Sequence, residues 1–178
     1  MNNDPRISQA YLAMQQELHK NPNYGVASLS AAPIVKQIMQ RYGIRSVSDY
    51  GAGKCNLRVG LQQNGVMGYD YFPYDPVFPE YGAPKPADLV CCIDVLEHIE
   101  IDFLPNVLED LRAITTKHGF FTVHTGKAEK ILPDGRNAHL IQQPPSWWLP
   151  RMCEHFEIEH VQRAPNGFWL LVEPLRPN

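Results

Sequence analysis

The sequence has no run of apolar residues long enough to cross a bilayer, which would take roughly 18 of them in succession. It begins with the polar residues 1–6, and no apolar segment of the signal-peptide type follows them. These absences predict a cytoplasmic protein without a membrane partner.

Basic residues are not in excess, because the chain carries 16 Lys and Arg against 19 Asp and Glu, a formal net charge of −3. Proteins that bind nucleic acid neutralise phosphates with an excess of basic side chains. The charge balance therefore disfavours nucleic acid as a partner, although it leaves room for a local basic patch. No oligomeric state is predicted from the composition.

Cysteine is sparse: the chain has four, and no two of them have the CxxC spacing. A secreted disulfide framework is denser in cysteine, so we expect reduced thiols. A linker rich in Pro, Gly or Ser is also missing, and 178 residues suit one domain. We therefore expect a single domain over residues 1–178.

The sequence does contain alternating helix and strand patterns. An apolar run at residues 87–93, which includes Cys91 and Cys92, has the length and character of a central strand buried on both faces. The alternation predicts an α/β protein, a Rossmann-like three-layer sandwich with a mostly parallel sheet, and the last two strands predict a C-terminal antiparallel hairpin. The expected helices span residues 4–20, 30–43, 103–115 and 147–155, with a shorter one holding Leu57, Val59 and Leu61; the expected strands span 46–50, 66–71, 87–93, 120–124, 156–162 and 168–173.

A glycine turn follows the first expected strand, where residues 49–53 read Asp-Tyr-Gly-Ala-Gly. Glycine lets a ligand approach the backbone closely while the chain turns into a helix. A dinucleotide fingerprint would need a further glycine where Asn56 stands. The turn thus predicts a cofactor loop and disfavours an NAD-dependent oxidoreductase, which is kept as an alternative.

Two segments carry a family resemblance. Residues 49–54 (Asp-Tyr-Gly-Ala-Gly-Lys) and 94–100 (Asp-Val-Leu-Glu-His-Ile-Glu) resemble two motifs of the class I S-adenosylmethionine-dependent methyltransferases, and the likeness covers about residues 24–175. It implies a methyltransferase that uses S-adenosyl-L-methionine and whose N-terminal helices, in residues 1–43, cap the cofactor site. The chain departs from the family pattern at Cys55, where a third glycine is frequent, and in residues 75–88, which are too short for a regular third strand with its helix.

The resemblance also implies which residues hold the cofactor. The glycine backbone would lie against its methionine and ribose portions, and an acidic residue at the end of the second strand would accept hydrogen bonds from the ribose hydroxyls. Asp70 and Asp75 both qualify, with Asp75 preferred because it lies in a Tyr-Asp-Pro sequence. The adenine edge is open among Tyr81, Lys85 and Ala87. The expected cofactor-binding residues are Tyr24, Asp49, Gly51, Ala52, Gly53, Asp70, Asp75, Asp94 and Val95.

A polar loop at residues 125–145 is the expected acceptor site, because loops at strand ends often carry function. The candidate catalytic residues are His139, His124 and Arg136: either histidine could act as the base, with Asp134 or Arg136 fixing the substrate. Glu97 and His98 could be an acid/base pair, but the family resemblance implies that they mainly shape the helix entrance and the floor of the site. The expected substrate-binding residues are Lys130, Asp134, Arg136, Asn137, His139, Trp147 and Trp148.

The histidines do not have HxxxH spacing and no pair of adjacent carboxylates accompanies them, so the sequence predicts no metal site. The overall acidity favours a small-molecule acceptor over a polymer. The predicted function is therefore S-adenosylmethionine-dependent methylation of a small molecule. The alternatives are the NAD-dependent oxidoreductase and a degenerate methyltransferase that binds cofactor without turnover.

Overall fold

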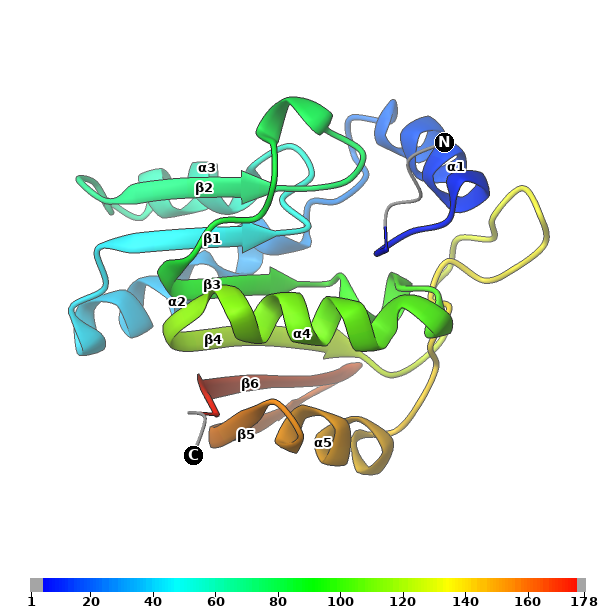
Figure 1. Cartoon of the computed structure of the whole chain (residues 1–178). Helices are drawn as coiled ribbons and strands as arrows, with labels where there is room; N and C mark the ends of the chain where they lie inside the picture. The colour runs from blue at the N-terminus through cyan, green and yellow to red at the C-terminus, as the bar shows by residue number, and fades with distance from the viewer. Residues whose placement is uncertain (1–4, 176–178) are drawn as a thin grey trace.

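A six-stranded sheet in the order β2-β1-β3-β4-β6-β5 forms the centre of the computed structural model, which describes residues 5–175 (Figure 1). The first four strands in this order are parallel, and β6 and β5 run antiparallel to their neighbours. The mostly parallel sheet and the C-terminal hairpin are thus confirmed. The strands are β1 (Ser46–Tyr50), β2 (Asp70–Tyr74), β3 (Ala87–Ile93), β4 (Thr115–His124), β5 (Phe156–Ala164) and β6 (Gly167–Pro174).

Helices cover both faces of the sheet, and α1 lies beside the edge at which the parallel strands end (Figure 1). The helices α4 and α5 pack on one face, whereas α2 and α3 pack on the other. None of the described helices combines the length and apolar character needed to cross a bilayer. The helices are α1 (Gln9–His19), α2 (Ala27–Tyr42), α3 (Asn56–Gln63), α4 (Leu104–Ile114) and α5 (Pro145–Cys153), and short 3₁₀ turns span Pro79–Tyr81, Leu96–His98 and Ile101–Phe103.

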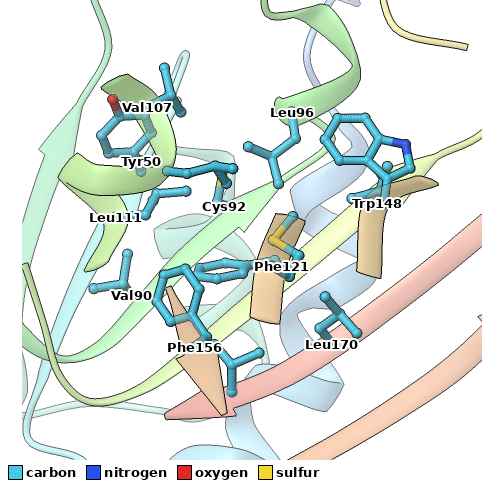
Figure 2. Close-up of a cluster of buried hydrophobic side chains, with 14 of the residues drawn as sticks. Tyr50, Val90, Cys92, Leu96, Val107, Leu111, Phe121, Trp148, Phe156 and Leu170 are labelled. Atoms are coloured by element: carbon cyan, nitrogen blue, oxygen red, sulfur yellow. The ribbon is translucent and has the colours of Figure 1, made fainter. Parts of the chain in front are cut away.

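Alternate side chains of β3 pack into two separate cores on opposite faces of the sheet, which explains its continuous apolar sequence. Val90 and Cys92 belong to the core beneath α4 and α5, shown in Figure 2, whereas Leu89 and Cys91 belong to the core beneath α2 and α3. Successive side chains of a strand point to opposite faces, so a strand covered on both sides has no polar face. The prediction that Cys91 and Cys92 lie in a buried strand is confirmed.

Several boundaries differ from the expected ones. β2 begins at Asp70 and not at residue 66, because it pairs residue for residue with β1 from Ser46↔Asp70 to Tyr50↔Tyr74 and so ends level with it. β4 begins at Thr115, directly after α4, and is therefore longer than expected. α1 begins at Gln9, capped by the Ser8 hydroxyl, while Asp4 of the expected helix lies outside the described residues.

The connection between β2 and β3 is short. Within residues 75–86 the only regular element is the 3₁₀ turn Pro79–Tyr81, as expected for a segment too short for a strand and helix. β2 is consequently an edge strand of the sheet.

Candidate functional site

The carboxyl ends of β1, β2, β3 and β4 open into a cavity of about 660 Å³. Its wall comes from the turns after these strands, from the loop after β4, and from the N-terminal segment that includes α1. Open α/β sheets place their ligands at this edge. The expected residues that line it are Tyr24, Gly51, Ala52, Gly53, Asp75, Asp94, Val95, His124, Lys130 and His139.

The glycine turn after β1 is packed too tightly for a side chain. Gly51 has φ +80°, and a Cβ placed on it would lie 2.4 Å from Cγ2 of Val95. The N–H groups of Gly51 and Ala52 both donate to the Tyr74 carbonyl, at 2.8 and 2.9 Å. The turn is thus held against the end of β2, and its backbone forms part of the cavity wall.

The two candidate ribose carboxylates lie at opposite ends of β2. Asp70 is exposed at the amino end and does not line the cavity, so it does not occupy the position that the family likeness requires. Asp75 follows the carboxyl end, is buried and lines the cavity. Its carboxylate accepts hydrogen bonds from the N–H groups of Gly53 (3.0 Å) and Val77 (2.8 Å), and burial raises its pKa.

Asp49 does not reach the cavity, contrary to its expected role as a cofactor contact. It is buried within β1 and accepts a hydrogen bond from the Tyr71 hydroxyl. Burial raises the pKa of Asp49 to about 7, against the smaller lowering by the Tyr71 hydroxyl. This carboxyl group supports the sheet beneath the turn.

Asp94 lies at the cavity wall directly after β3 in a left-handed backbone conformation, with φ +58°. Such a conformation is uncommon for a residue other than glycine and is frequent at functional sites. The Asp94 N–H donates to the hydroxyl of Thr122 on β4 at 2.9 Å. Val95, next along the chain, packs over Gly51 and also lines the cavity.

Three histidines lie together on the cavity wall. The ring centroid of His139 is 4.8 Å from that of His98 and 4.5 Å from that of His124. Nδ1 of His98 lies 2.8 Å from the Ala138 carbonyl, and Nδ1 of His139 lies 2.7 Å from the Gly126 carbonyl. A carbonyl only accepts, so both Nδ1 atoms donate and both neutral rings keep the lone pair on Nε2.

His124 has the opposite tautomer. Its Nδ1 accepts the Gly126 N–H at 3.2 Å, so the proton of the neutral ring lies on Nε2. His98 is partly buried beside these groups, and desolvation lowers its pKa. Of the two bases expected from the sequence, only His139 presents an unprotonated nitrogen in this arrangement.

Glu97 lies fully buried behind the histidines. Its Oε1 accepts the His124 N–H at 2.7 Å, whereas Oε2 has no hydrogen-bond partner among the described residues. Burial raises the pKa of Glu97 well above its usual range, and the neighbouring Asp94 carboxylate raises it further. Glu97 itself does not line the cavity, but His98 does.

The N-terminal segment supplies cavity residues that the sequence did not reveal: Tyr11, Gln15 and His19 of α1. Gln15 donates to the Tyr11 hydroxyl at 2.6 Å, and its oxygen accepts from the Tyr24 hydroxyl at 3.3 Å. Gln15 lies one helical turn after Tyr11 in the helix expected over residues 4–20, and a polar side chain on the same face as a tyrosine was the available signal.

The loop after β4 contributes fewer side chains to the cavity than expected. Lys130 and His139 line it, whereas Asp134, Arg136 and Asn137 do not. Arg136 pairs with Asp134 at 2.7 Å and with Glu100 at 3.5 Å. The Asn137 amide bonds the backbone of Ala128 on both sides, so it shapes the loop.

The two tryptophans do not form a wall of the site. Trp148 is fully buried in the core beneath α4 and α5 (Figure 2). Trp147 packs against it, and its ring lies 3.6 Å from the Arg151 guanidinium carbon. Neither tryptophan lines the cavity, contrary to the expected contact with substrate, because α5 packs on the sheet away from it.

No protein-family model and no curated protein sequence matches the chain. Among solved structures, 1,6-didemethyltoxoflavin-N1-methyltransferase of Burkholderia thailandensis, with bound 1,6-didemethyltoxoflavin and S-adenosylhomocysteine, is 15% identical with a TM-score of 0.64, covering 99% of this chain and 94% of that one. A complex of DhpI with S-adenosylhomocysteine is 13% identical (TM-score 0.60, 94% and 98% covered), and magnesium protoporphyrin IX methyltransferase of Synechocystis with bound S-adenosylmethionine is 11% identical (0.55, 94% and 92%). The chain therefore has the Rossmann-like fold of the class I S-adenosylmethionine-dependent methyltransferases.

Proposed function

We propose that the protein is an S-adenosylmethionine-dependent methyltransferase that acts on a small molecule in the cytoplasm. The observation that carries the proposal is one cavity with two different walls. A glycine turn and a buried aspartate form one wall, and a histidine cluster forms the other. The first suits a nucleoside cofactor, and the second suits an acceptor that must lose a proton.

The residues at the glycine wall fit the cofactor. At Gly51 a Cβ would collide with Val95, so only the backbone faces the ligand at this point. Each carboxylate oxygen of Asp75 accepts one hydrogen bond from the backbone. A carboxylate has about four lone-pair sites, so Asp75 can still accept from two ribose hydroxyls. The cavity volume of about 660 Å³ also lies within the usual range for small-molecule sites.

When bound, S-adenosylmethionine supplies an electrophilic methyl group. The protein then has to align the acceptor, exclude water and, for a hydroxyl or amine, remove a proton. Nε2 of His139 carries the lone pair that can take this proton, with Lys130 nearby on the same wall. His124 presents a protonated nitrogen instead and suits a hydrogen-bond donor to the acceptor.

A small acceptor is favoured because α1 is tied across the cavity. The Ser8 N–H and hydroxyl donate to the two carboxylate oxygens of Glu100, both at 2.9 Å. Arg6 pairs with Asp110 on α4. We accordingly propose that the N-terminal helices cap the site within a single domain. The small ligand named in the Burkholderia structure supports the same acceptor class.

Calorimetry and thermal unfolding with S-adenosylhomocysteine test the proposal, with NAD as the matched control ligand. We expect S-adenosylhomocysteine to bind and raise the Tm, since a ligand selective for the folded state stabilises it. A Tm raised by NAD alone would support the oxidoreductase. Binding of S-adenosylhomocysteine without turnover on any candidate acceptor would support the binding module.

A further inference from the structure

The histidine cluster and the end of β3 bring potential metal ligands together. Asp94, His98 and His139 each offer one ligand atom, and these atoms all lie within 4.8 Å of one another. The residues come from three segments: the turn after β3, the 3₁₀ turn Leu96–His98, and the loop after β4. The two histidines are far apart in sequence, so no local motif reveals the group.

Both imidazole rings are already oriented as metal ligands are. In metal sites the second ring nitrogen of a ligating histidine usually donates to a carbonyl or carboxylate, which fixes the tautomer. Nδ1 of His98 donates to the Ala138 carbonyl and Nδ1 of His139 to the Gly126 carbonyl, at 2.8 and 2.7 Å. Each ring therefore has Nε2 available as a ligand.

The buried carboxyl group of Glu97 is a second, independent observation beside this group. It is fully buried, and its Oε2 has no hydrogen-bond partner within the described chain. Neither Glu97 nor Asp94 forms an ion pair with Lys or Arg among residues 5–175. A buried carboxyl group beside a second carboxylate needs a proton or a positive ion to neutralise it.

We propose that Asp94, His98 and His139 bind one divalent transition-metal ion. Two imidazoles and a carboxylate suit Mn²⁺, Fe²⁺, Co²⁺ or Zn²⁺, whereas Mg²⁺ and Ca²⁺ prefer a shell of oxygens alone. The left-handed backbone of Asp94 turns its residue into the cavity wall and fits this use of a strained position.

The role of the ion rests on the proposed function. An acceptor hydroxyl bound to the ion becomes more acidic, as metal-bound water does. Its O–H bond breaks, the proton leaves to solvent, and the electron pair stays on the oxygen. The metal thereby selects acceptors with a hydroxyl that can reach the cluster. With the ion bound, Nε2 of His139 is a ligand and not the base, and the ion itself promotes loss of the proton.

The first measurement is metal binding by the full chain after dialysis against a chelator. We expect one equivalent of Co²⁺ to bind with visible d–d absorption and without the near-ultraviolet band of a thiolate ligand. Calorimetry should show binding of Mn²⁺ or Zn²⁺ and none of Mg²⁺ at the same concentration. A thiolate band would point to the exposed Cys153 and contradict the assignment.

Variants decide whether the binding is at this cluster. His139→Gln and Asp94→Asn should each weaken Co²⁺ binding by at least about 100-fold, beyond the 10–100-fold typical of losing a second-shell partner. Glu97→Gln keeps the acceptor for the His124 N–H and should cause a smaller loss. His124→Gln, in the same cluster but outside the ligand group, should bind Co²⁺ as the wild type does.

A second control is His118→Gln, since His118, Glu159 and Glu173 form another group with ligand spacing on the sheet. Wild-type binding that is absent, or lost in His118→Gln but kept in His139→Gln, overturns the proposal. S-adenosylhomocysteine affinity is measured on every variant. If the wild-type protein binds S-adenosylhomocysteine but not Co²⁺, the metal site is wrong and the methyltransferase proposal stands. If it binds Co²⁺ at the cluster but not S-adenosylhomocysteine, the metal site stands and the methyltransferase proposal fails.

Discussion

The cavity has a proposed cofactor wall, or backbone wall (Gly51, Ala52, Gly53 and Asp75), and a proposed acceptor wall, or side-chain wall (His98, His124 and His139). The two are built in different ways. The cofactor wall is mostly backbone: the glycine turn donates to the Tyr74 carbonyl, and Asp75 accepts from the N–H groups of nearby residues. The acceptor wall is mostly side chains, with His98 and His139 brought together from separate segments. A wall made of backbone tolerates little substitution, but a short sequence motif is enough to predict it. A wall made of side chains can change with the substrate, and because its residues are far apart in sequence it is recognised only in the folded structure.

The largest expected effect is at the backbone wall. Gly51→Val should abolish the thermal shift with S-adenosylhomocysteine, because its side chain would meet Val95 and the residue has φ +80°. Gly126→Ala is the matched control, since its Cβ would meet nothing closer than 3.7 Å. Gly51→Ala combined with Val95→Ala should recover part of the binding lost in Gly51→Ala alone. Full binding by Gly51→Val would mean that the turn does not contact the cofactor.

The next effect is at the side-chain wall. His139→Gln should lower turnover by about 100-fold or more, the usual contribution of a group that removes a proton or holds the acceptor. Its affinity for S-adenosylhomocysteine should stay within about threefold of wild type, because the other wall holds the cofactor. His124→Gln should lower turnover much less, since its Nε2 is already protonated. Equal losses in single-turnover assays of the two variants would contradict the assigned tautomers.

The two aspartates at opposite ends of β2, Asp70 and Asp75, sharpen the comparison. Asp75→Ala should weaken S-adenosylhomocysteine binding by about 10–100-fold, because hydrogen bonds to a charged group are worth about 1.5–3 kcal/mol. Asp70→Ala, at the exposed far end of the strand, should leave the affinity unchanged. Calorimetry measures both. A larger loss of affinity in Asp70→Ala than in Asp75→Ala would show that Asp75 is not the carboxylate that binds the cofactor.

Asp49 tests whether a buried carboxyl group beneath the glycine turn acts on stability alone. Its pKa of about 7 means that between about pH 4 and pH 7 the folded protein keeps a proton that the unfolded chain has lost. Raising the pH across this window should therefore lower the free energy of unfolding, by about 2–4 kcal/mol from this group. Urea unfolding at about pH 5 and about pH 8 should show a smaller decrease in Asp49→Asn. An unchanged decrease would mean that other groups cause it.

The smallest effect is expected at Arg136, on the outside of the acceptor wall. Its pairs with Asp134 and Glu100 are partly exposed, and such pairs contribute at most about 1 kcal/mol. Arg136→Ala should therefore change turnover by less than about fivefold. A rise of tenfold or more in the KM for the acceptor would instead support the substrate contact expected from the position of Arg136 in the sequence.

The difference between the walls explains what the sequence could predict. β1, β3, the glycine turn and the C-terminal hairpin are set by local patterns, and all of them were found within a few residues. The start of β2 was missed, because its pairing register with β1 fixes it and its own apolar pattern does not. The β4 start was missed for the same reason: pairing with β3 extends it past its apolar core.

Side-chain placement beyond local patterns was harder to predict. Trp147 and Trp148 could equally have lined a pocket or filled a core, and only the packing of α5 against the sheet decides for the core. The group of Asp94, His98 and His139 depends on the path of the loop after β4, which no spacing in the sequence encodes. The prediction of no metal site considered only short spacings, and it stays a prediction against which the proposed ion at this group can be tested.

The short connection after β2 also affects how the protein can associate with other chains. Because no strand forms between residues 75 and 86, β2 presents an open sheet edge to its surroundings. Exposed edges are templates for the strands of other chains, and proline on an edge strand is one way in which proteins prevent this. Pro73 lies within the five residues of β2 and has no N–H to donate. The strand that ends at the cofactor wall is thus also a poor starting point for aggregation.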